Sequence, residues 1–202
     1  MSLRPRDIIF AAIFIALAVG GGLAMAQFPN VELITAAIFL SGMMLGVGFG
    51  VVVGAVAEFL YSFFNPYGLA APPLLIAQVI SMMLVGATGG LVRNLFGQRC
   101  PPAWVLGLIG WALTFIFDLL TTLSFTIVVG SGIAGFFAAI AIGFYFYLAH
   151  QVSNLLIFAL LLPVLFRHLR QLPVFNTAIP IVKSLQHPHP QPSLSLPAER
   201  KS

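Results

Sequence analysis

Six long apolar runs occupy most of this chain, and they constrain its fold more than any other feature. An α-helix needs about 20 mainly apolar residues to cross the hydrocarbon core of a membrane. The 202 residues are 60% apolar and 7% charged, whereas a soluble domain carries roughly a quarter charged residues. This charge is too sparse to cover a water-facing globule, which excludes a soluble enzyme, a nucleic-acid-binding protein and a disordered chain. The sequence therefore predicts an all-α integral membrane protein.

The runs predict six transmembrane helices, with five or seven as the alternatives. Only the glycine-rich stretch 46–50 separates the second run from the third, so we expect a tight helical hairpin there. Together the runs define a transmembrane domain over residues 1–170. The predicted spans are Asp7–Gln27, Leu33–Leu45, Val47–Phe64, Leu74–Val92, Trp104–Val129 and Phe136–Phe166.

The basic residues predict the orientation of these spans. They precede the first span, separate the fourth from the fifth, or follow the sixth: Arg4, Arg6, Arg93, Arg99, Arg167, Arg170, Lys183, Arg200 and Lys201. With six spans, every one of them falls on the same side of the membrane. The positive-inside rule makes that side cytoplasmic, and both termini are then cytoplasmic.

The first span has an alternative interpretation as a cleavable signal peptide. Arg4 and Arg6, an apolar run and the small residues at 24–26 resemble such a segment. The apolar run over 8–26 is longer than the usual signal core of about 7–15 residues. Its removal would also place the amino terminus outside, so a retained span is favoured.

Residues 171–202 differ from the rest of the chain. They are rich in Pro, Ser and His, and such a composition lacks the apolar surface needed for folding. They predict a disordered cytoplasmic tail. His187 and His189 lie in this tail, and two histidines in a flexible segment make a weak metal site. With a single cysteine in the chain, no metal or cofactor is expected.

Polar residues within the predicted spans gather in the outward half of the membrane. Such groups are costly at this depth and usually face a cavity or a partner helix. Glu58 and Asp118 have no Lys or Arg in any span, so only a ligand, a proton or His150 can neutralise them. The sequence predicts a pocket open to the outside for a neutral, cationic or donor-rich substrate. Its candidate residues are Gln27, Asn30, Glu32, Glu58, Tyr61, Asn65, Gln78, Asp118, Thr122, His150 and Asn154.

Part of this set has a purely structural alternative. Hydroxyl side chains often bond to their own helix backbone, and polar side chains can bridge neighbouring helices. For Gln78, Thr121, Thr122, Tyr145 and Tyr147, the structural alternative has the same weight as a role in substrate binding.

Small residues recur at intervals of four along several spans. Ala12, Ala16 and Gly20 lie in the first span, and glycines stand at positions 42, 46, 50, 54, 86 and 90. This spacing puts small residues on one helix face, where two backbones can approach closely. For the glycines the favoured interpretation is internal packing. Ala12 and Ala16 lie near the cytoplasmic end of their span, where an external partner could dock instead.

Several stretches resemble the substrate-binding S components of energy-coupling factor (ECF) transporters. They are residues 28–35, residues 54–59, and the loop Asn65-Pro66 with Pro72-Pro73 and Gln78 after it. The resemblance covers residues 7–168 and implies a six-helix bundle that captures a vitamin or similar micronutrient from outside. It also implies a membrane-embedded coupling subunit and two cytoplasmic ATPases as partners. The family's Ala-x-x-x-Ala contact with the coupling subunit maps onto Ala12 and Ala16, and its substrate-contacting loop maps onto residues 27–32.

Three functions from different classes follow. The leading one is a non-enzymatic substrate-capture subunit of an ATP-driven importer in a bacterial or archaeal cell membrane. It needs external ATPases because the chain has no G-x-x-x-x-G-K-[ST] motif. The runner-up is a self-sufficient proton-coupled carrier that uses Glu58 or Asp118 as its proton site. The third is a membrane enzyme or scaffold with His150 and Asp118 as an acid–base pair.

Overall fold

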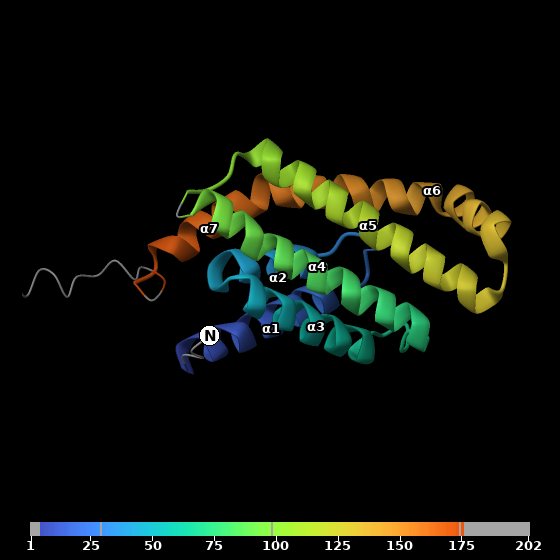
Figure 1. Cartoon of the computed structure of the whole chain (residues 1–202), viewed down its shortest axis with the longest axis horizontal. Coiled ribbons are helices and arrows are strands. Elements are labelled where there is room, and N and C mark those ends of the chain that lie inside the picture. The colour runs from blue at the N-terminus through green and yellow to red at the C-terminus, as the bar shows by residue number, and fades with distance from the viewer. Residues whose placement is uncertain (1–4, 29, 98, 174, 176–202) are drawn as a thin grey trace, which may run out of the picture.

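The computed structural model describes residues 5–28, 30–97, 99–173 and 175, which form a helical bundle without strands (Figure 1). The helices are α1 (Pro5–Met25), α2 (Ile34–Leu45), α3 (Val47–Phe64), α4 (Pro72–Phe96), α5 (Ala103–Val129), α6 (Gly132–Leu156) and α7 (Leu162–Gln171), with a π-helical turn, Ile157–Leu161, joining the last two. The all-α prediction is confirmed for this part of the chain. The predicted tail over 171–202 lies almost entirely outside the described residues.

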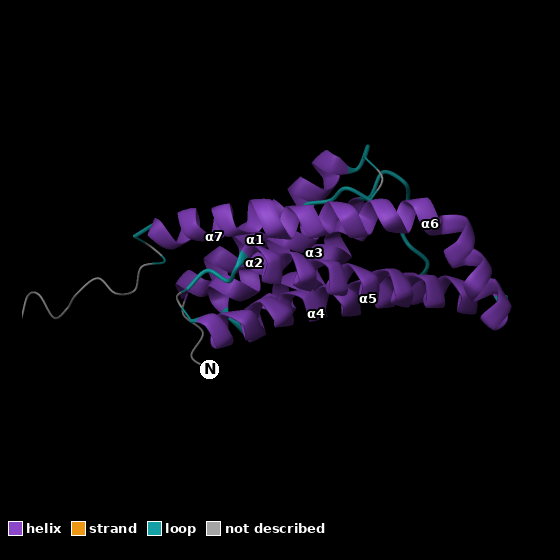
Figure 2. Ribbon diagram, turned by 90° about the horizontal axis from the view of Figure 1, so that it is seen from above, coloured by secondary structure: helices purple, strands orange, loops and turns teal. Residues whose placement is uncertain are grey.

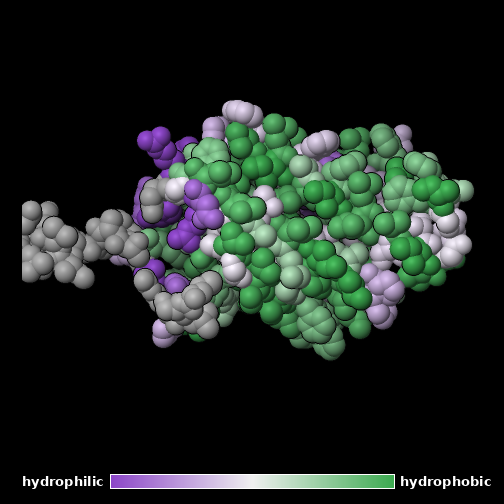
Figure 3. Space-filling view, viewed as in Figure 1, coloured by the Kyte–Doolittle hydropathy of each residue, from purple (hydrophilic) through white to green (hydrophobic). Residues whose placement is uncertain are grey.

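Successive helices run in opposite directions along the bundle. The start of α1, the connection from α4 to α5 and the end of α7 therefore lie at one end, which we call the basic end (Figure 1). Hydrophilic residues gather at this end, while most of the remaining surface in that view is hydrophobic (Figure 3). At the opposite end, the hairpin of α5 and α6 extends beyond the ends of α3 and α4 (Figures 1 and 2).

Five helical segments are long and apolar enough to cross a membrane: Pro5–Met25, Val47–Phe64, Pro72–Phe96, Ala103–Val129 and the continuous stretch Gly132–Gln171. The remaining predicted span corresponds to α2, which has only 12 residues. At 1.5 Å per residue, α2 is about 18 Å long, against about 30 Å of hydrocarbon. Six predicted spans thus correspond to five long helices and one short one.

The short helix α2 lies at the centre of the bundle. Ten of its 12 residues are buried, and it packs against α1, α3 and α4. A helix that is apolar on all sides belongs in such an interior. Gly46 alone separates α2 from α3. Its backbone φ of 98° is one that residues other than glycine rarely adopt. The predicted tight hairpin is confirmed.

Glycines hold α2, α3 and α4 at backbone contact. A Cβ added at Gly86 would overlap the backbone carbonyl of Gly50, and one added at Gly42 would overlap that of Gly86. Gly54 meets the backbone of Met82 in the same way. These glycines serve internal packing, as their spacing predicts. The face of α1 that carries Ala12, Ala16 and Gly20 is exposed instead.

Candidate functional site

A cavity of about 570 Å³ lies between the middle of α5 and α6 and the ends of α1, α3 and α4 that are away from the basic end. The loop before α2 and the loop between α3 and α4 complete its walls. This volume falls in the range of about 300–1,000 Å³ that is typical of small-molecule sites. The candidate site is therefore built by seven segments, five helices and two loops.

Eight of the eleven predicted substrate residues line this cavity. They are Asn30, Glu32, Glu58, Tyr61, Asn65, Gln78, Asp118 and His150. Since they come from the loop, α3, α4, α5 and α6, helix packing has gathered them at one place. Their role in binding a substrate stays a prediction.

The other three predicted residues do not line the cavity. Gln27 is exposed on the loop, although its neighbours Ala26 and Phe28 are lining residues. Thr122 is buried, and its hydroxyl lies 2.6 Å from both the Asp118 carbonyl oxygen and the Tyr147 hydroxyl. That arrangement matches the structural alternative given above for Thr122.

Asn154 is fully buried one helical turn after His150. Neither its side-chain nitrogen nor its side-chain oxygen has a hydrogen-bond partner among the described residues. A buried polar group without partners destabilises the fold by about 1–3 kcal/mol. Asn154 is thus a polar residue inside the packed core, beyond the cavity wall.

His150 joins two carboxylates at the floor of the cavity. Its Nδ1 lies 2.8 Å from Asp118 Oδ1, and its Nε2 lies 3.3 Å from Glu32 Oε1. Only a doubly protonated imidazole can donate to both oxygens, because the neutral ring has one donor and one acceptor. When both carboxyl groups are ionised, the two pairs therefore require an imidazolium between them, and little solvent surrounds the three groups.

Further donors hold these two carboxylates in place. The Gln151 amide donates from Nε2 to Asp118 Oδ2 at 2.8 Å, and the Thr35 hydroxyl donates to Glu32 Oε1 at 2.9 Å. Asp118 and Glu32 therefore each accept hydrogen bonds from two residues. No pattern in the sequence singles out Thr35 or Gln151, although Gln151 directly follows His150.

The loop between α1 and α2 is held against α6 at cavity depth. The Asn30 amide donates from Nδ2 to the Phe146 carbonyl at 2.7 Å, and the Ser153 hydroxyl donates to the Asn30 carbonyl at 2.6 Å. Non-helical backbone is tolerated at membrane depth where it is buried in protein or lines a cavity. Asn30 thus contributes to the site mainly by positioning the loop that carries Glu32.

Glu58 differs from the other two acids. Its side chain is 2% exposed and lines the cavity, yet no described residue forms a hydrogen bond or ion pair with its carboxylate. Gly50 packs on Gly86 and Gly54 on Met82, and the same antiparallel register places Glu58 opposite Gln78. Gln78 Oε1 is also buried without a partner among the described residues.

Aromatic side chains form much of the remaining wall: Phe28, Tyr61, Tyr67, Phe117, Phe146 and Tyr147. Space for the Tyr61 ring depends on Gly22, because a Cβ there would lie 2.9 Å from the ring. The Tyr67 hydroxyl donates to the Ala26 carbonyl at 3.0 Å and connects two loops over the cavity. Phe146 and Tyr147 precede His150 by four and three residues, a spacing from which a shared helix face could have been predicted.

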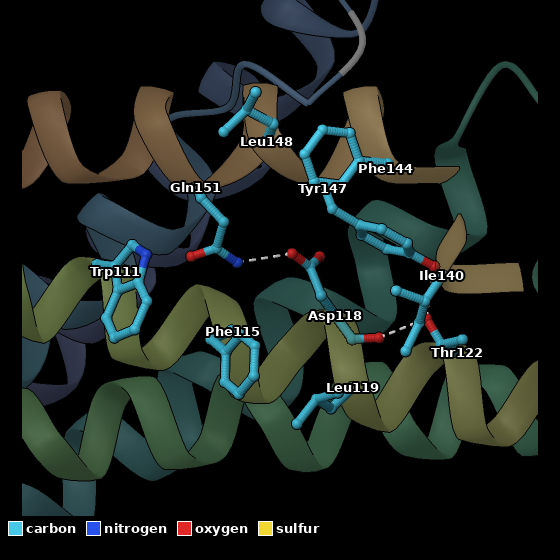
Figure 4. Close-up of a pocket in the computed structure, with 10 residues that line it drawn as sticks. All are labelled: Trp111, Phe115, Asp118, Leu119, Thr122, Ile140, Phe144, Tyr147, Leu148 and Gln151. Atoms are coloured by element: carbon cyan, nitrogen blue, oxygen red, sulfur yellow. Dashed lines mark hydrogen bonds between the residues drawn. The ribbon is translucent and has the colours of Figure 1, made fainter. Parts of the chain in front are cut away.

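A second cavity of about 240 Å³ lies between α5 and α6 (Figure 4). Most of its lining is apolar, including Trp111, Phe115 and Phe144, and all three are exposed on the described surface. Asp118 and Tyr147 line both cavities. Figure 4 shows Gln151 and Asp118 joined across this space by the hydrogen bond from Gln151 Nε2 to Asp118 Oδ2.

No protein-family model matches the chain, and no curated protein or solved structure is significantly similar to it. The described residues contain no group of three or more His, Cys, Asp or Glu side chains arranged to hold a metal ion.

Proposed function

We propose that this protein is the substrate-capture subunit of an ECF-type importer for a vitamin or similar micronutrient. The single observation that carries the proposal is the 570 Å³ cavity, in which polar and aromatic side chains from five helices and two loops converge. A site of this size with a few placed polar groups is typical of small-molecule binding. The resemblance of residues 28–35 and 54–59 to S components supports the same function.

In this proposal the chain crosses the cell membrane of a bacterium or archaeon six times. The short helix α2 completes one crossing together with the loop that precedes it, since that loop lies at cavity depth against α6. Arg93 and Arg170 belong to the basic end, and basic residues favour the cytoplasmic side. The cavity then faces outward, and both termini are cytoplasmic.

The proposed activity is binding without catalysis. Both ring nitrogens of His150 are within hydrogen-bond distance of carboxylates, and Asp118 is bonded to His150 and Gln151. A general base needs a free acceptor within reach of the proton that it removes. The observed pairing supports a positioning role for His150 and disfavours the acid–base interpretation.

Transport would depend on a membrane-embedded coupling subunit and two cytoplasmic ATPases. Ala12 and Ala16 are exposed on α1, and a Cβ at Gly20 would meet no atom within 4 Å. A face of small residues allows another helix to approach closely. This open face supports the assignment of Ala12 and Ala16 to the contact with the coupling subunit.

The double variant Ala12→Leu/Ala16→Leu tests that assignment. We expect substrate uptake by cells to be lost while substrate binding by the purified variant is retained. Ala112→Leu is the matched control, because Ala112 is an exposed alanine on α5 outside both cavities. Equal loss of binding and uptake in the double variant would contradict the contact.

A self-sufficient proton-coupled carrier is the second candidate. It is favoured by Glu58, a buried carboxylate without a partner among the described residues, which is the kind of group that carries a proton in transporters. This candidate predicts uptake driven by an ion gradient in proteoliposomes that contain this chain alone. Uptake that requires the coupling subunit and ATPases would exclude it.

A further inference from the structure

We infer that the cavity takes a positively charged, donor-rich molecule, such as an amine, an amidine or an aminated heteroaromatic ring, and that Glu58 faces its charge. This inference rests on the proposed capture function and specifies the class of substrate. It is carried by the charges around the cavity, by the pairing of the acids and by the aromatic wall.

The charges that line the cavity are unequal. Three carboxylates, Glu32, Glu58 and Asp118, contribute negative charge, and the described lining contains neither Lys nor Arg. His150 is the positively charged group that the hydrogen bonds indicate. When all three acids are ionised, one positive charge opposes three negative ones, which leaves a net negative cavity.

The pairing shows which acid faces the ligand. His150 bonds to Asp118 and Glu32, and Gln151 and Thr35 add further donors to these two. Glu58 receives no donor from the described residues although its side chain is 2% exposed. An uncompensated buried carboxylate is strongly destabilising, so Glu58 is neutralised either by a proton or by a cation in the cavity, and a cationic ligand can replace that proton.

Gln78 lines the same cavity as Glu58. Its Oε1 is buried without a hydrogen-bond partner among the described residues. Because its amide carries both an acceptor and two donors, Gln78 can bond to a donor or an acceptor of a ligand that lies beside Glu58.

The aromatic wall is also suited to a cation. Tyr61, Phe117 and Tyr147 line the same cavity as Glu58. A ring face attracts a cation within about 6 Å, more strongly where water is excluded. A flat cationic ligand can stack on these rings while it donates to Glu58, whereas a carboxylate ligand would meet three other carboxylates.

Three matched probes test the inference: benzamidine, benzamide and benzoate share one ring and differ in charge. Binding to the purified full chain in nanodiscs is measured at millimolar probe concentration by saturation-transfer NMR. A charge-assisted hydrogen bond contributes about 1.5–3 kcal/mol, so benzamidine should bind about 10- to 100-fold more tightly than benzamide. Benzoate should bind most weakly. Equal or tighter binding of benzamide, or no detectable binding of benzamidine, would overturn the inference.

Glu58→Gln locates the preference, because it keeps the size of the side chain and removes the charge. The benzamidine-to-benzamide ratio should fall to about one in this variant and stay unchanged in the control Asp7→Asn, which lies at the far end of α1. An undiminished ratio in folded Glu58→Gln would overturn the role of Glu58. If that variant fails to fold, the wild-type ratio alone still decides the preference for a cation.

The outcome is separable from the proposed function. A capture subunit that associates with a coupling subunit but binds a neutral or anionic substrate would leave the function standing and refute the cation. A chain that prefers benzamidine through Glu58 but supports uptake without ATPases would do the reverse.

Discussion

The two ends of the α3–α4 pair are built from different residues in a single register. Toward the basic end the facing positions are Gly50 with Gly86 and Gly54 with Met82, and the backbones touch. One turn further along, the facing positions are Glu58 and Gln78, and the helices border a cavity. The same helices thus form a closed packed half and an open polar half.

This difference indicates how close helix packing at one end can fix the positions of polar side chains at the other end. Backbone contact leaves the packed half little freedom, since a Cβ would not fit at Gly42, Gly50 or Gly86. Binding sites need side chains that are positioned before the ligand arrives, and rigid elements provide this best. The packed half therefore supports the position of Glu58 and Gln78 in the open half.

The largest expected effect comes from breaking the packed half at Gly86. In Gly86→Leu the new side chain would overlap the backbone of Gly50, which cannot move away as a flexible side chain can. Overpacking a core typically costs about 1–3 kcal/mol, and a backbone clash should exceed that range. We expect loss of the monodisperse folded peak in size-exclusion chromatography. The control Gly20→Leu should keep this peak, because Gly20 faces open space.

His150→Leu should have the next largest effect, in the open half. It leaves Asp118 and Glu32 close together without the imidazolium between them. Removing one partner from a buried ion pair destabilises a fold by about 3–5 kcal/mol. Thermal unfolding in detergent measures the loss, and adding Asp118→Asn to this variant should restore part of it. Unchanged unfolding temperature in His150→Leu would show that the bonded cluster contributes little.

The helices and the packed glycines could be predicted from the sequence, whereas the central position of α2 could not. The apolar runs predict the helices, and spacing at intervals of four predicts the role of the glycines, because both depend on local periodicity. The placement of Glu58, Gln78 and Asp118 away from the basic end follows from counting residues along each helix. The predicted span Leu33–Leu45 is already short in the sequence. Sequence alone does not show that α2 lies at the centre of the bundle, since a buried helix and a membrane span have the same composition.

The site was only partly predictable for a related physical reason. Tyr147 and Asn154 lie about two turns apart on nearly the same face of α6, yet Tyr147 lines the cavity and Asn154 lies in the core. How deep along α6 the cavity extends depends on tertiary packing, which the sequence does not show. The two partners of His150 are 32 and 118 residues distant in sequence. Such pairings are set by tertiary packing and leave no local pattern.

Asn154→Leu tests where the open polar region ends and the packed core begins, and it should stabilise the protein. Leucine has a similar volume and removes two polar atoms that lack partners among the described residues. Relief of this penalty amounts to about 1–3 kcal/mol. A higher unfolding temperature with unchanged benzamidine binding is expected. Reduced binding would place Asn154 in the site after all.

Tyr67→Phe should give the smallest effect. It removes the hydrogen bond from the Tyr67 hydroxyl to the Ala26 carbonyl, which lies at an exposed position over the cavity. A single neutral hydrogen bond contributes about 0.5–1.5 kcal/mol, and exposure favours the lower end. A small decrease in unfolding temperature is expected. Tyr145→Phe, on an exposed side chain outside both cavities, should show none.

The central claim is that the open half captures a small molecule that other subunits then import. Mass spectrometry of the protein purified gently from its own membrane tests this claim most directly, because it detects bound small molecules and associated chains together. We predict a vitamin-sized ligand in the cavity, together with a coupling subunit and two ATPases. A folded chain with an empty cavity and no associated ATPase would contradict the claim.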